Sequence, residues 1–75
     1  MYYIIYKEDG DDPILFEPLH HVQDAVNKVT DLIEVGYLAE EKLELSDSEK
    51  EQISKYHYFI TPGGAWYIKR VRTLP

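Results

Sequence analysis

Apolar side chains recur at helical spacing in the first half of the chain, and this is the clearest pattern in the sequence. From residue 22 they fall at i, i+3, i+4, i+7, i+10 and i+11, which marks one face of an α-helix. Pro18 suits the entry to this helix, and Gly36 is the residue type expected just after its last turn. The pattern predicts an amphipathic helix over residues 20–35, with the apolar members Val22, Ala25, Val26, Val29, Leu32 and Ile33.

Short apolar and aromatic runs on both sides of this helix predict strands. Residues 2–6 read Tyr-Tyr-Ile-Ile-Tyr, a composition typical of a strand. Residues 8–13 predict a turn, and Ile14 to Phe16 a second short strand. Within the mixed segment 37–45, Leu43 and Leu45 alternate with polar residues and predict a short half-buried strand, and residues 55–61 predict another. We expect the core to join four helix residues to Ile60 and part of 2–6; the four are Val26, Val29, Leu32 and Ile33.

Two segments leave alternatives open. Ser46 and Glu49 have the spacing of a capping box, so residues 47–54 form either a short helix or a charged loop. Pro62-Gly63-Gly64 either turns a hairpin into a strand over 65–71 or follows Thr61 as the cap of a helix. This second choice separates the two candidate folds.

Two short motifs resemble winged-helix domains. Val29 to Leu38 is similar to the end of that family's third helix, which commonly has a Leu-x-x-x-Gly-Tyr-Leu type pattern. Tyr56 to Gly64 resembles the end of the wing and the Thr-Pro-x-Gly start of a closing helix. The resemblance covers residues 22–71. It implies a small winged-helix-like α+β domain, with wing strands at 38–45 and 55–61, a recognition helix at 20–35 and a helix over 62–71.

The strand composition of the first twenty residues favours a different α+β fold. In this alternative a compact antiparallel sheet of two hairpins packs on one amphipathic helix, and the second hairpin turns through Pro62-Gly63-Gly64. In outline it is similar to small acidic phage proteins that dock on host enzymes. Two classes of function therefore stay open. The winged-helix resemblance implies DNA binding, whereas the net charge and the tyrosine content favour protein interaction.

Length and charge narrow the class of protein. The 75 residues are expected to form a single domain over 1–75. Fourteen acidic and eight basic side chains give a net charge of -6, which disfavours nucleic acid. With no cysteine, no signal peptide and no apolar run long enough to cross a membrane, we expect a cytoplasmic protein with no membrane partner.

No motif for catalysis, metal or cofactor binding stands out. His20 and His21 are adjacent, so on a helix they do not face the same way. Asp9, Asp11 and Asp12 lack the glycine and glutamate positions of a calcium loop. We therefore expect a binding protein with no catalytic residue, no metal and no cofactor.

The candidate contact residues fall into two sets. For DNA binding they are the outward helix residues and the basic end of the chain, namely Gln23, Asn27, Lys28, Thr30, Lys69, Arg70 and Arg72. For a protein partner they belong to the acidic stretch 40–51, represented by Glu40, Glu41 and Glu44. Seven tyrosines in so short a chain also suggest an exposed amphipathic patch and self-association as a homodimer.

Overall fold

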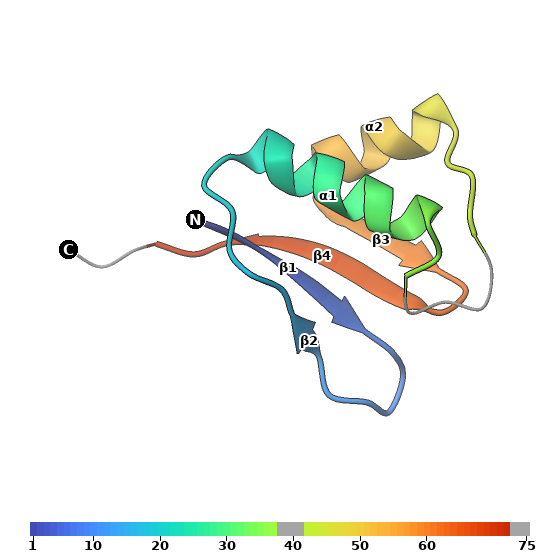
Figure 1. Cartoon of the computed structure of the whole chain (residues 1–75), viewed down its shortest axis with the longest axis horizontal. Coiled ribbons are helices and arrows are strands. Elements are labelled where there is room, and N and C mark those ends of the chain that lie inside the picture. Colours follow the sequence, from blue (N-terminus) through green and yellow to red (C-terminus); the bar gives the residue numbers. More distant parts are fainter. Residues whose placement is uncertain (38–41, 73–75) are drawn as a thin grey trace.

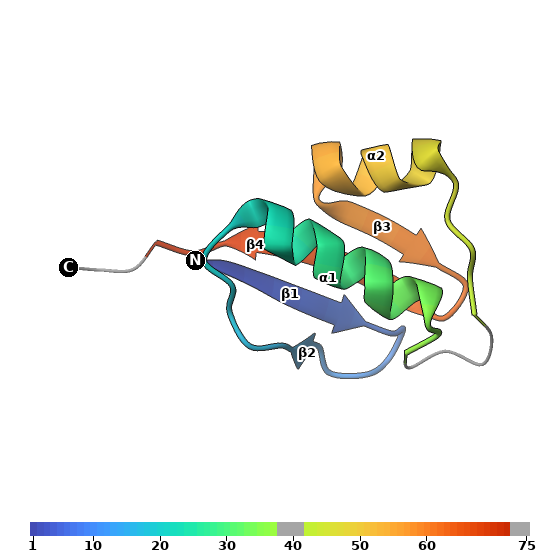
Figure 2. The same ribbon diagram turned by 45° about the horizontal axis from the view of Figure 1, so that its top comes forward.

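Four antiparallel strands and two helices make up the domain. The structure is a computed structural model that describes residues 1–37 and 42–72. In chain order the elements are β1 (Tyr2–Lys7), β2 (Ile14–Leu15), α1 (Val22–Glu34), α2 (Asp47–Tyr56), β3 (Tyr58–Thr61) and β4 (Gly64–Arg70). The strands lie in the order β2-β1-β4-β3, and both helices cover the same face of the sheet (Figures 1 and 2).

Two hairpins supply the sheet, and their long strands β1 and β4 pair at its centre. β1 pairs with β4 along its whole length, from Tyr2 opposite Arg70 to Lys7 opposite Ala65. Within the second hairpin, the Thr61 hydroxyl donates to the carbonyl of Gly64 at 2.9 Å. Gly64 is required here, because a Cβ would lie 2.7 Å from the carbonyl oxygen of Lys7 on the neighbouring strand.

The core lies between the sheet and the helices. Trp66 on β4 is 2% exposed, and its ring lies 4.6 Å from that of Tyr6 on β1. The buried apolar residues are Ile4 and Tyr6 of β1, Phe59 of β3, Trp66 and Ile68 of β4, Ala25, Val26, Val29 and Ile33 of α1, Ile53 of α2, and Leu45. β1 and β4 therefore give alternate side chains to the core, as strand geometry requires, whereas both residues of β2 are exposed.

The predicted amphipathic helix is confirmed as α1, and the capping-box spacing does begin a helix. The Ser46 hydroxyl accepts from the backbone N–H of Glu49 at 3.2 Å, while the Glu49 carboxylate accepts from the N–H of Ser46 at 3.0 Å. α2 ends at His57, whose φ of 57° is left-handed. Ile53 is its one buried residue, so this helix is attached to the core by a single large apolar side chain.

The α+β class is confirmed, and the arrangement is that of the two-hairpin alternative with a second helix added. The helix expected over 62–71 from the winged-helix resemblance is wrong, because β4 pairs with strands on both sides. The strand expected over 38–45 is also wrong for residues 42–45, which lie outside any strand; residues 38–41 are outside the described part of the chain. The strand expected over 55–61 begins only at Tyr58. The winged-helix resemblance as such stays a prediction.

The predicted core needs two corrections. Val26, Val29 and Ile33 are buried together as expected, but Leu32 is only half-buried. Ile60 is 63% exposed, and its neighbour Phe59 is buried instead. Alternate residues of a strand point to opposite faces, so choosing the wrong one of two apolar neighbours reverses the face assigned to each.

Candidate functional site

The DNA-binding residues predicted on the helix lie beside a groove between α1 and α2. Gln23, Asn27 and Thr30 line this groove, which has a volume of about 560 Å³. Their polar groups already have local partners. The Gln23 amide donates to the Asn27 side-chain oxygen at 3.0 Å, and the Thr30 hydroxyl donates to the carbonyl of Val26 at 2.9 Å. Lys28 is exposed on the same helix.

The groove has the wrong charge for a phosphate backbone. Asp31, Glu34 and Glu51 line it, against Lys50 as its one basic residue. The Lys50 ammonium lies 3.9 Å from the Glu34 carboxylate, so this base is partly neutralised. A surface with this balance repels DNA.

The basic residues predicted for DNA binding are divided between two faces of the molecule. Lys69 pairs with Tyr3 across the strands, and both alternate with buried neighbours, so Lys69 points away from the helices. Arg70 is exposed on the helix side, and Arg72 is exposed just beyond β4. The structure therefore does not bring Lys69 together with the polar residues of α1.

The acidic set predicted for a protein partner is only partly described. Glu44 is exposed in the segment before α2, whereas Glu40 and Glu41 lie outside the described residues. His20 and His21 are exposed, and no group of three or more metal-ligating side chains occurs within residues 1–37 and 42–72.

Sequence reasoning missed the face of the sheet that the helices leave uncovered. Ile5, Tyr67 and Tyr58 follow one another across β1, β4 and β3 by strand register, and Leu15 of β2 continues the row. The rings of Tyr58 and Tyr67 lie 5.0 Å apart at 44°. Tyr3 and Ile60 lie on the same face by alternation. We call this surface the open face, with the apolar members Tyr3, Ile5, Leu15, Tyr58, Ile60 and Tyr67.

Exposure of the open face is greatest at its two edges. Leu15 is 66% exposed and Ile60 63% exposed, whereas Tyr3, Ile5, Tyr58 and Tyr67 are half-buried against one another. None of the four strands contains an acidic residue. The strong alternation in β4 could have shown that Tyr67 and Lys69 share a face, but only the register shows that Ile5 and Tyr58 join them.

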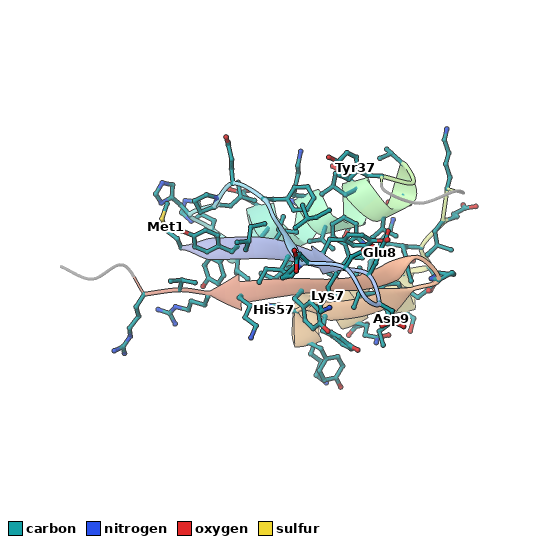
Figure 3. The ribbon with its side chains drawn as sticks, turned by 90° about the horizontal axis from the view of Figure 1, so that it is seen from below. Met1, Lys7, Glu8, Asp9, Tyr37 and His57 are labelled. Carbon is teal, nitrogen blue, oxygen red and sulfur yellow. The ribbon has the colours of Figure 1, made fainter. Side chains whose placement is uncertain are left out.

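Charged residues lie at the two ends of the open face. Figure 3, seen from the side away from the helices, has Met1 at one end of the sheet and Glu8 and Asp9 near the other. The end near Met1 also carries the C-terminal end of β4, because Tyr2 pairs with Arg70. At this basic end Lys69 lies on the open face and Arg72 is exposed just beyond β4, while Arg70 is on the helix side. The acidic end is the β1–β2 loop with the exposed residues Asp9, Asp11 and Asp12.

Lys7 lies on the open face at the acidic end and offsets one of its negative charges. Its ammonium donates to the backbone carbonyl of Asp11 at 3.1 Å, which holds this side chain against the acidic loop. The loop itself turns through Gly10, whose φ is 82°, and the N–H of Asp11 donates to the carbonyl of Glu8 at 3.3 Å.

The described residues form a small α+β domain whose two helices lie on the face of the sheet opposite to the open face. Comparison with protein-family models, curated proteins and solved structures gave no match. In the described part of the chain, neither helix has the length and apolar character needed to cross a bilayer.

Proposed function

We propose that this chain is a non-catalytic protein-interaction module and that the open face is its contact surface. The observation that carries this proposal is the row of tyrosine and aliphatic side chains across four strands, on the face of the sheet opposite to both helices. Tyrosine and exposed aliphatic residues are typical of the centres of protein interfaces. Contiguous exposed apolar surface on a small domain generally marks such a contact.

The charge distribution supports a protein partner over a nucleic acid. The net charge is -6, and the groove beside the predicted recognition helix is lined mostly by acids. The open face has charges of both signs at opposite ends, a pattern suited to a partner that also carries both signs. A phosphate backbone offers only negative charge, so it would be attracted at one end and repelled at the other.

Site-specific photo-crosslinking tests this proposal in cells that make the protein. A photoreactive phenylalanine analogue replaces Leu15 or Ile60, which lie at the two edges of the open face. The matched control replaces Val35, which is 62% exposed just after α1. We expect protein adducts from Leu15 and Ile60 and none from Val35. Absence of protein adducts from both open-face positions, or equal adducts from Val35, overturns the proposal.

A winged-helix-like, DNA-binding regulator is the second candidate, and the basic end favours it. Lys69, Arg70 and Arg72 are all exposed, and α1 presents Lys28 to solvent. Under this proposal Lys28→Ala or Arg70→Ala weakens binding to every duplex and flattens the salt dependence by about one unit each. Asn27→Ala instead relaxes sequence preference. Absence of duplex binding in a low-salt anisotropy titration eliminates this candidate.

A further inference from the structure

We infer that the occupant of the open face is a second copy of this chain, packed face to face with its strands running in the opposite direction. This inference rests on the proposed function and names the partner of the same surface. Opposite charges lie at the two ends of the face, and apolar residues lie between them.

Two orientations of a two-fold axis in the plane between two sheets keep the strands of both copies aligned. An axis along the strands puts the basic end of one copy on the basic end of the other, and acid on acid. An axis across the strands reverses one sheet, so Lys69 of each copy, together with the end of β4 that leads to Arg72, approaches the acidic loop of the other copy. Only the second arrangement is self-complementary, as a two-fold interface must be. The charges at the two ends therefore favour the arrangement with the two-fold axis across the strands.

The apolar centre is compatible with this arrangement. The row formed by Leu15, Ile5, Tyr67 and Tyr58 crosses the sheet roughly midway between the charged ends. When the second copy is turned about an axis across the strands, this row of one copy faces the same row of the other copy. Tyrosine rings can then pack against aliphatic side chains of the partner, with their hydroxyls directed to the edge where water remains.

The small size of the face indicates a weak dimer. The four strands have 6, 2, 4 and 7 residues. At about 3.3 Å per residue and about 4.8 Å between strands, they give a footprint of roughly 300 Å² per copy. Stable interfaces bury about 800 Å² per partner, and weak or transient ones bury less. We therefore expect a reversible dimer with a Kd in the range of about 10 μM to 1 mM.

Sedimentation equilibrium over this concentration range tests the dimer, with two charge variants. The first, Lys69→Glu with Arg72→Glu, makes both ends acidic. The second, Asp9→Lys with Asp12→Lys, makes both ends basic. We expect each variant alone to dimerise at least about tenfold more weakly than the parent, because like charges then meet at both ends. An equimolar mixture should form a heterodimer, since every end meets its opposite.

Control measurements separate local contacts from net charge. Lys28→Glu with Lys55→Glu makes the same change in net charge on the two helices, away from the open face, and should dimerise like the parent. Added salt should weaken the parent dimer, because its end contacts join opposite charges. An axis along the strands predicts the reverse, since salt would then screen repulsion.

Several results would overturn the inference that the chain forms this dimer. A chain that remains monomeric at 1 mM overturns the inference, as does a dimer that salt strengthens or that the helix variant weakens equally. Photo-crosslinks from Leu15 and Ile60 to a different protein only, with a monomeric parent, overturn the dimer and leave the protein-interaction function supported. Binding of a single-stranded oligonucleotide by the open face, with no dimer and no protein adduct, overturns both.

Discussion

Ile53 is expected to be the most important residue of α2 for stability, and truncating it tests how that helix is held. The side chain is 1% exposed and is the one buried residue of the helix. Ile53→Ala removes three carbon groups at about 0.8 kcal/mol each, or roughly 2.4 kcal/mol. A void that does not collapse adds to this, within the range of about 2–5 kcal/mol measured for such changes. We expect a loss of about 3–4 kcal/mol.

Ile60→Ala is the matched control, because it makes the same chemical change at a position that is 63% exposed. About a third of its surface is buried, so the expected loss is about 1 kcal/mol. A domain of this length has a total stability of roughly 4–11 kcal/mol, so the Ile53 change removes a large fraction of it.

Urea unfolding followed by the fluorescence of Trp66 measures both losses. This residue is the chain's one tryptophan and is 2% exposed in the core. With a slope near 1 kcal/mol/M, Ile53→Ala should lower the midpoint by about 3 M and Ile60→Ala by about 1 M. The protein is kept dilute so that the dimer does not contribute. Equal losses, or a larger loss for Ile60, would refute the assignment of Phe59 and Ile53 to the core and of Ile60 to the open face.

Three further predictions follow from local contacts. Gly64→Ala should destabilise the fold by about 1–3 kcal/mol in urea unfolding, because its Cβ would lie 2.7 Å from the carbonyl of Lys7; an unchanged midpoint contradicts the strand register. Burial, and secondarily the hydrogen bond donated to Glu8, raise the pKa of Tyr6. The resulting stability is present below about pH 10 and is lost as the pH rises through the folded value; Tyr6→Phe should remove this part of the alkaline loss, seen by circular dichroism. Ser46→Ala should cost about 0.5–2 kcal/mol and reduce helicity, and unchanged ellipticity at 222 nm would contradict the capping box.

The sequence predicted α1 well because a long amphipathic helix repeats its pattern several times. Four of the predicted apolar residues are buried, namely Ala25, Val26, Val29 and Ile33. Leu32, which is only half-buried, does not change which face of the helix the pattern assigns to the core. The start of α2 was also predictable, because Ser46 and Glu49 satisfy each other locally and need no distant contact.

The strands were harder to predict because their outcome depends on partners far away in sequence. Phe59 and Ile60 are both apolar, so composition alone does not say which of them faces the helices. Pro62-Gly63-Gly64 suits either a hairpin or the start of a helix. The hairpin forms because β4 pairs along its length with β1, which lies more than fifty residues away in the sequence. The motif resemblance at Tyr56 to Gly64 therefore predicted the wrong structure for the end of the chain.

The candidate site was beyond local prediction for the same reason. Its charged ends come from the loop after β1 and from the end of β4, which are distant in the chain. Their opposition along one face exists only because β1 and β4 are antiparallel and central. In the sequence the same charges appear as a net value of -6 and a basic end, which suggest DNA contacts at Lys69 and Arg70. Once the strands are paired, Lys69 lies on the open face with Tyr3 and Tyr67, away from α1. Lys69, which suggested DNA contacts in the sequence, is therefore part of the surface that we propose as a protein contact.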